Sequence, residues 1–308
     1  MADDPSRRSL LRWAALGAAG LAGCRARGLD LAKGSLPLAS GTVATPPAPA
    51  SARMPTAFVG HGSPMTMVDP TAGGPWTQWG QAMPRPRAVL VVSAHWEQHP
   101  FTLGATTTVP LLFDFFGFPD ELYEVRYPAP GAPALADQVE KLVKPVYATD
   151  REPERALDHG AFAPLVWLYP QADVPVLQMS IPSYDPKLLF AAGRALAPLR
   201  DEGVLIVGSG NVTHNLGRVG RGGSAPPSWA ADFDAWTADV LTRGDTDALL
   251  DWTRKAPAAA TNHPTPDHWL PIYVVAGAAD GAKATFPVTG WEGGSISRRC
   301  VQWGGPPT

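Results

Sequence analysis

The stretch Ala88-Val89-Leu90-Val91-Val92-Ser93-Ala94-His95 carries the clearest fold signal in the 308-residue sequence. A short, continuous apolar run is typical of a central strand that is buried on both faces of a sheet. Similar runs occur at residues 56–59, 174–181 and 204–208, and helix-like stretches occur at residues 132–143, 186–200 and 229–242. This alternation of strand and helix predicts an α/β protein.

Met54 begins the predicted domain, because no second linker and no internal repeat follows it. We therefore expect residues 54–308 to form a single catalytic domain with a central mixed, largely parallel β-sheet flanked by helices on both faces. The late segments 284–288 and 295–303 are expected to add antiparallel strands, which would make the sheet mixed.

The N-terminal residues have the pattern of a targeting signal. Residues 6–11 (SRRSLL) resemble a twin-arginine export motif, and the apolar stretch 13–23 is too short to span a bilayer. Residues 21–24 (LAGC) resemble a lipobox, in which Cys24 becomes lipidated. The sequence thus predicts a signal over residues 1–24, read by the twin-arginine export machinery, and a periplasmic protein or membrane-anchored lipoprotein. The alternative is an uncleaved amphiphilic tail.

The composition narrows the possible partners and metal ligands. Residues 25–53 are rich in Ala, Pro, Gly and Ser and read as a tether. The formal net charge of −3 gives no electrostatic footprint for nucleic acid, so no nucleic-acid partner is expected. With Cys24 lipidated, Cys300 is the only cysteine left, which excludes an intramolecular disulfide or a cysteine metal cluster. Any metal must be held by His, Asp or Glu.

Four of the seven histidines stand at predicted element ends. His61 and His95 each come directly after a predicted buried strand, and His214 follows the strand at residues 204–208 through a short turn. Carboxyl ends of parallel strands meet at one edge of a sheet, so these side chains are expected to converge. Gly60 and Gly62 flank His61 and allow a sharp turn there.

His268 is predicted to join them from the first turn of a helix. Thr265 is a suitable N-cap and Pro266 suits the first helical position. No pair of histidines has a short metal-ligand signature such as HExxH, and for any single one a structural role is the alternative. A convergent set of imidazoles without thiolates suits Zn, Fe, Cu or Ni.

Other candidates have weaker patterns. His99 is expected in a loop, and only its nearness to His268 supports a role for His263. The aromatic run 113–118 is either the wall of a pocket or part of the core. Asp158 stands next to His159 and is a candidate to hold one of its tautomers, although adjacent residues on a strand point apart.

Six motifs follow one another in order from about Met54 to the C-terminus. They are GHGSPM (60–65), VSAHW (92–96), YPAPG (127–131), LDHG (157–160), GNVTHN (210–215) and PTPDHWLP (264–271). Together they resemble the successive motifs of the 4,5-DOPA extradiol dioxygenase family, which belongs to the class III ring-cleaving superfamily related to protocatechuate 4,5-dioxygenase.

The resemblance implies roles for five histidines. His61, His95 and His268 would be metal ligands, and His214 would be either a fourth ligand or an acid/base residue beside the substrate. His159 would be either an acid/base residue in the pocket or a residue that supports the metal ligands from behind. Many iron dioxygenases use two histidines and one carboxylate, so Asp267 is the alternative third ligand if the register differs by one.

The activity that the resemblance implies is extradiol cleavage of a catechol, DOPA-like or a related aromatic diol, by dioxygen to give a semialdehyde. It would need one mononuclear metal per chain, Fe(II) for activity, although Zn is able to occupy the same site. Two alternatives stay open at this stage: a zinc-dependent hydrolase on the same histidines, and a non-catalytic lipoprotein that binds a metal or ligand.

Overall fold

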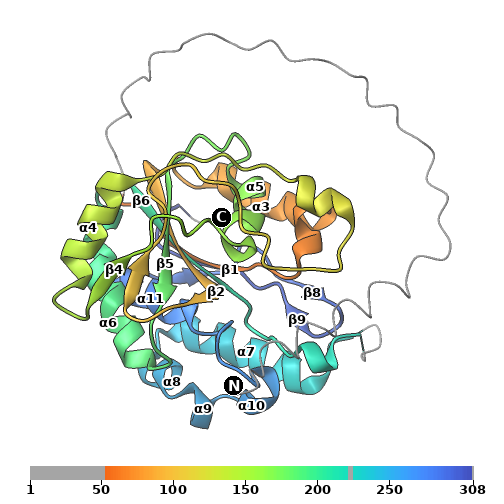
Figure 1. The fold of residues 1–308 in the computed structure, drawn as a ribbon. Coiled ribbons are helices and arrows are strands. Elements are labelled where there is room, and N and C mark those ends of the chain that lie inside the picture. Colours follow the sequence, from red (N-terminus) through yellow and green to blue (C-terminus); the bar gives the residue numbers. More distant parts are fainter. Residues whose placement is uncertain (1–52, 221–224, 307–308) are drawn as a thin grey trace, which may run out of the picture.

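The computed structural model describes residues 53–220 and 225–306, so the predicted signal and all of the tether except Arg53 lie outside the described residues (Figure 1). Its centre is a sheet with the strand order β4-β3-β5-β2-β6-β1-β10-β7. The strands are β1 (Thr56–Gly60), β2 (Ala88–Glu97), β3 (Phe101–Leu103), β4 (Thr149–Arg151), β5 (Val176–Ile181), β6 (Val204–Gly210), β7 (Ala284–Thr285) and β10 (Val301–Trp303).

The sheet is mixed and largely parallel, as predicted. Strands β5, β2, β6 and β1 lie side by side in parallel. At one end β10 pairs antiparallel with β1, and β7 pairs antiparallel with β10; at the other end β3 is antiparallel to β5 and parallel to β4. The predicted late strand at 295–303 is divided into β9 (Ile296–Ser297), which pairs with β8 (Trp291–Glu292), and β10.

Helices cover both faces of the sheet because successive strand residues point to opposite sides. Leu90 and Ile206 face a core that includes α4 (Pro133–Val143), α6 (Pro186–Leu196), α7 (Ser228–Arg243) and α11 (Pro271–Ala279). Val91 and Val207 face the second core, which includes α3 (Pro70–Ala82) and α5 (His159–Leu168). Each fully buried Leu, Ile or Val contributes about 1.5–3 kcal/mol relative to exposure.

Short helices complete the described chain. They are η1 (Pro64–Met67), η2 (Asp120–Glu124), η3 (Ala197–Arg200), η4 (Leu216–Arg218), α8 (Thr246–Leu250), α9 (Trp252–Lys255) and α10 (Ala259–Asn262). The helix expected at 186–200 becomes 3₁₀ after Leu196, where Pro198 has no N–H for the next helical hydrogen bond.

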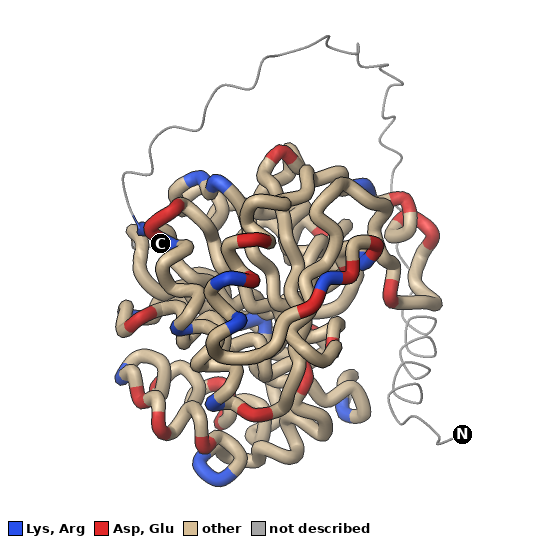
Figure 2. Tube along the Cα trace, turned by 60° about the vertical axis from the view of Figure 1, so that its left-hand side comes forward, with Lys and Arg blue, Asp and Glu red and all other residues tan. Residues whose placement is uncertain are grey.

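The surface carries charges of both signs. In the view of Figure 2, Lys and Arg are interspersed with Asp and Glu. Within the residues that the structure describes, none of the helices is both long and apolar enough to cross a membrane.

Candidate active site

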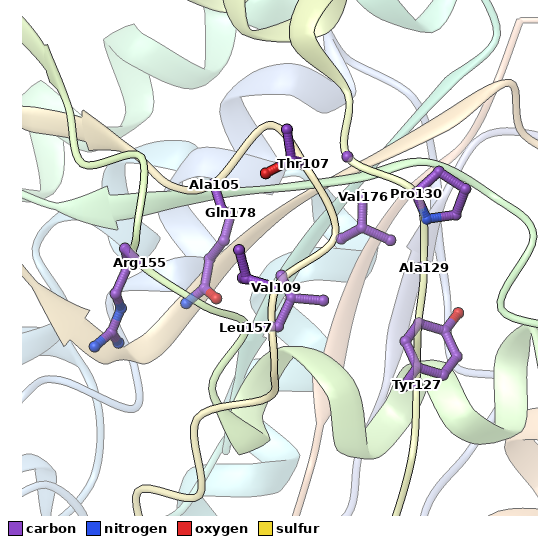
Figure 3. Close-up of a pocket in the computed structure, with 11 residues that line it drawn as sticks. Ala105, Thr107, Val109, Tyr127, Ala129, Pro130, Arg155, Leu157, Val176 and Gln178 are labelled. Carbon is purple, nitrogen blue, oxygen red and sulfur yellow. The ribbon is translucent and has the colours of Figure 1, made fainter.

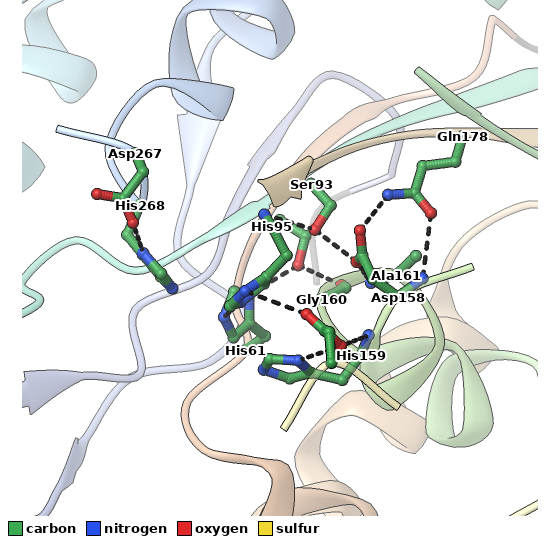
Figure 4. Close-up of polar contacts among 12 residues, drawn as sticks. His61, Ser93, His95, Asp158, His159, Gly160, Ala161, Gln178, Asp267 and His268 are labelled. Atoms are coloured by element: carbon green, nitrogen blue, oxygen red, sulfur yellow. Dashed lines mark hydrogen bonds and ion pairs between the residues drawn. The ribbon is translucent and has the colours of Figure 1, made fainter. Parts of the chain in front are cut away.

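Two histidines meet at the carboxyl edge of the parallel strands. His61 directly follows β1, and β6 separates β1 from β2. The Nε2 atoms of His61 and His95 lie 3.2 Å apart, and their ring centroids 5.0 Å apart (Figure 4). The sequence prediction placed His95 after its strand, but β2 continues to Glu97. The pairing of β2 with β5 shifts register between Val92 and Glu97, and such an irregularity turns a side chain toward a site.

His159 enters the cluster from the start of α5. The carboxylate of Asp158 caps this helix by accepting a hydrogen bond from the backbone N–H of Ala161. The cap fixes the first turn, so the buried imidazole of His159 lies with its centroid 4.0 Å from that of His95 and 5.5 Å from that of His61.

His268 approaches from a turn and not from the predicted helix. Helix α11 begins only at Pro271, and the preceding turn is closed by a 2.8 Å hydrogen bond from Trp269 N to Pro266 O. Thr265 does not cap a helix, because residues 267–270 form a turn and no helix begins directly after Thr265. The ring of His268 nevertheless faces the cluster, with its centroid 5.2 Å from that of His61 and 4.9 Å from that of His95.

His214 lies in the segment that leaves β6 and stacks on His268. The two ring centroids are 3.5 Å apart and the ring planes differ by 9°. The backbone N–H of His214 donates to Asn262 O at 3.1 Å. The structure thus brings together all five histidines to which the sequence assigned a role.

Helix α10 and the residue after it hold the His214 segment by side-chain hydrogen bonds as well. His263, which is buried outside the cluster, donates from Nε2 to Val212 O at 2.8 Å. Asn215 donates from Nδ2 to Thr261 O at 2.5 Å. His99 is exposed and stands apart, near Tyr147.

Four of the clustered imidazoles have Nδ1 next to an oxygen of another side chain. The pairs are His61 with Ser209 Oγ at 2.9 Å, His95 with Asp114 Oδ2 at 3.4 Å, His159 with Asp114 Oδ1 at 2.8 Å, and His268 with the Asp267 carboxylate. Carboxylates only accept, and the Ser209 hydroxyl already donates to Gly160 O. Nδ1 of His61 and of His268 therefore carries the proton, and the Nε2 lone pairs of these two rings remain for a ligand, as in metal sites with supported histidines. The 3.4 Å contact between His95 and Asp114 favours the same tautomer of His95.

The buried histidines fall into two electrostatic classes. Burial lowers the pKa of His61, His95 and His214 well below the usual value, and neighbouring imidazoles lower it further, so these rings are neutral. Burial also opposes protonation of His159, but the charge and hydrogen bond of Asp114 outweigh it and raise the pKa of His159.

The donor set fits one mononuclear metal. The ligand atoms of His61, His95 and His159 lie within 4.8 Å of one another, and those of His214, Asp267 and His268 form a second group of the same kind. Neutral imidazoles with free Nε2 atoms suit a borderline divalent ion such as Fe or Zn.

Two supporting residues, Asp114 and Ser209, were missed by the sequence analysis. Asp114 stands within the aromatic run 113–118, and the sequence pattern there indicates only a pocket wall or a part of the core. The proposed partner of His159 was Asp158, but that carboxylate points away and receives hydrogen bonds from Ser93 and Gln178 (Figure 4). Asp158 occupies an N-cap, where the side chain turns back toward its own helix.

The aromatic run lies at the edge of the core, with Phe115 buried and Phe116 exposed. Phe113 packs edge-on against Phe162, with ring centroids 5.7 Å apart, and Phe115 is buried against Tyr123. Phe115 also contacts the ring of His159 edge-on at 5.5 Å, so one side of the run borders the histidine cluster.

A separate small pocket lies beside the supporting network (Figure 3). Arg155 and Gln178 line it, and both also donate to the carboxylate of Asp158. The seven histidines, all of them in the described part of the chain, do not contribute to its lining.

Comparison with known proteins decides what this arrangement is. Residues 57–297 match the model of the catalytic LigB subunit of aromatic ring-opening dioxygenase. The chain belongs to this family. It is 43% identical over 261 residues to the 4,5-DOPA dioxygenase extradiol of Escherichia coli K12, covering 82% of this chain and 96% of that protein. It is 38% identical over 250 residues to the Beta vulgaris protein of the same name, covering 79% and 93%.

A solved structure supports the same assignment. The crystal structure of an uncharacterized protein from Escherichia coli K12 superposes with a TM-score of 0.71 at 38% sequence identity, covering 82% of this chain and all of that one. The family resemblance, the α/β fold and the extradiol ring-cleaving activity expected from the sequence are thus confirmed. The comparisons favour neither the zinc hydrolase nor the non-catalytic lipoprotein.

Proposed function

We propose that this extradiol dioxygenase cleaves a catechol at one Fe(II) held by His61, His95 and His268, with His159 and His214 acting on the substrate. The single observation that carries the proposal is the convergence of three imidazole rings whose Nδ1 atoms each contact a side-chain oxygen: His61, His95 and His268. A bound Fe(II) supplies open coordination positions and the redox chemistry that lets dioxygen react with an aromatic diol.

Two ligand sets share His61 and His95 and differ in the third residue. The sequence motifs support His268, whose Nδ1 is held by Asp267 and whose free Nε2 faces the other two rings. His159 completes a compact trio in the geometry but carries the raised pKa of a proton-holding group. We therefore assign His268 to the metal and His159 to proton transfer.

The proton transfers follow from the two electrostatic classes. A catechol must lose at least one phenolic proton, and a neutral imidazole such as His214 is able to accept it. His159, whose positive charge Asp114 stabilises, is able to return a proton as the ring opens. Buried Phe115 covers one edge of the His159 ring.

The substrate is an aromatic diol of the DOPA type. The two relatives described above are named for 4,5-DOPA, and the chain covers more than nine-tenths of each. An aromatic flank beside His159 is suited to a flat ring.

The decisive experiment compares metals on one anaerobic preparation of apoprotein. Fe(II) should give dioxygen consumption and a yellow semialdehyde from DOPA or another catechol, in equal amounts, whereas Zn(II) should bind without turnover. Hydrolysis of an ester or amide with the Zn(II) form, together with no dioxygen uptake from the Fe(II) form, would instead establish the hydrolase.

We also propose that the catalytic domain is exported behind the signal at residues 1–24 and the tether at residues 25–53. The twin-arginine pattern at residues 6–11 and the lipobox at Cys24 support this proposal. The twin-arginine route carries folded proteins, and a metal site built from distant segments requires a folded chain.

A further inference from the structure

Asp114 contacts two histidines of different proposed function with one carboxylate. Its Oδ1 lies 2.8 Å from Nδ1 of His159 and 2.9 Å from the backbone N of the same residue. Its Oδ2 lies 3.4 Å from Nδ1 of His95. Within the described residues, the other supported rings of the cluster each have their own partner, Ser209 or Asp267.

The carboxylate is held in place by its neighbours in the chain. Phe113 packs against Phe162, and Phe115 against Tyr123 and His159, so aromatic side chains anchor the backbone on both sides of Asp114. The backbone N–H of Leu112 donates to Leu157 O at 2.9 Å, which ties the same loop to the segment before α5. Asp114 thus has little freedom to follow one imidazole away from the other.

The carboxylate has the geometry of a double acceptor. Its two oxygens are both hydrogen-bond acceptors, and each one faces the Nδ1 atom of a different imidazole. One side chain therefore orients both rings.

We infer that Asp114 is the positioning residue that couples metal retention to proton transfer, through His95 on one oxygen and His159 on the other. The inference rests on the proposed function in its assignment of roles to the two histidines. Supporting carboxylates of this kind typically contribute about 10–100-fold to metal affinity or activity. Replacing Asp114 should therefore change both metal affinity and the rate of turnover. The change in metal affinity should arise through His95, and the change in turnover through His159.

The test is a double-mutant cycle with two separate readouts. Asp114→Asn should weaken Co(II) binding, measured by titration of the apoprotein, by about 10–100-fold. At saturating Fe(II) it should lower kcat for catechol cleavage by a similar factor and leave KM for the catechol unchanged. In a His159→Gln background, Asp114→Asn should cause no further loss of kcat but should still weaken Co(II) binding.

Matched variants keep the outcome decisive. Asp120→Asn removes an equal charge from an exposed position in the same region and should change neither readout. If Asp114→Asn folds poorly, Asp114→Ala replaces it in both measurements. The thermal midpoint of unfolding of this variant shows whether it is folded. Equal kcat losses in both backgrounds, or unchanged Co(II) affinity, would overturn the inference. If wild-type protein with Fe(II) cleaves no catechol, the proposed function fails. The Co(II) titration of Asp114→Asn still tests whether Asp114 supports His95 as a metal ligand.

Discussion

The imidazole of His214 lies flat on that of His268, with centroids 3.5 Å apart and planes within 9°. The position of His268 therefore depends on the segment that follows β6 as well as on its own turn. His214 influences the site in two separable ways, by the nitrogen atoms of its ring and by the surface that it offers to His268.

Replacing His214 separates these two contributions. His214→Phe keeps a flat ring under His268 but removes the proton acceptor, so it should retain metal and lower kcat by roughly 10²–10⁴-fold. His214→Ala removes the ring as well and should also weaken metal retention, though less than His61→Ala. Metal content and cleavage rate are measured on the same preparations. Complete loss of metal from the phenylalanine variant would make His214 a ligand.

The ligand assignment predicts a different order for the remaining histidines. His61→Ala and His95→Ala should abolish stoichiometric metal, and His268→Ala should do so or nearly so. His159→Gln should keep the metal and slow turnover by roughly 10²–10⁴-fold. If Asp267→Ala loses metal while His268→Ala keeps it, the carboxylate is the third ligand. His99→Ala should behave like wild type.

The buried imidazole of His263 should make the free energy of unfolding fall in mild acid. Burial, only partly offset by its hydrogen bond to Val212, lowers its pKa from 6.5 to about 4. Between these values the unfolded chain binds more protons, so stability falls as pH falls from 6.5 toward 4, by up to about 3 kcal/mol. His263→Gln keeps a donor for Val212 O but does not titrate. Urea unfolding of both proteins at pH 7 and pH 4.5 should show a smaller loss in the variant; equal losses contradict the prediction.

Replacing Asp158 should lower the stability of the fold strongly. Its fully buried carboxylate caps α5 and receives hydrogen bonds from Ser93, Gln178 and Arg155, whose side chain is 18% exposed. Asp158→Asn leaves the Arg155 charge without its partner and should destabilise the fold by on the order of 3 kcal/mol. Asp239→Asn, in an exposed pair with Arg243, is the control and should cost about 0.5 kcal/mol or less.

The export proposal is tested on residues outside the described structure. Replacing Arg7 and Arg8 by lysine should leave a full-length precursor in the cytoplasm, and Cys24→Ser should abolish lipid labelling without loss of catalytic activity. Cell fractionation with an immunoblot, together with labelling by a fatty-acid probe, measures both. Normal export of the double-lysine variant would remove the twin-arginine pathway from the proposal.

The sequence predicted the parallel core of the fold because its signal is local. The apolar runs that became β1, β2, β5 and β6 have the composition that burial on both faces demands. Element ends were less predictable, since β2 ends where its pairing with β5 ends and not where the apolar run stops. Pro266 likewise suited a helix start, yet it begins a turn, in which the backbone N–H groups of Trp269 and Leu270 both donate to Pro266 O.

The histidines were found because strand ends and family motifs mark them in the sequence. Their supporting residues were not, since Asp114 lies 45 residues from His159 and Ser209 lies 148 residues from His61. Neither partner has a pattern of its own. Only the packing of the aromatic run and the register of β6 beside β1 bring them into contact.

The order of the strands limits when the enzyme can acquire its metal. β1 lies between β6 and β10, so the first strand of the described chain waits for partners made much later. His61 and His268 are more than 200 residues apart in the chain. A nascent polypeptide still emerging from the ribosome cannot yet present all of these imidazoles. Metal loading is therefore a late event that cannot precede synthesis of His268, and scarcity of the metal at that moment would leave a finished but inactive protein.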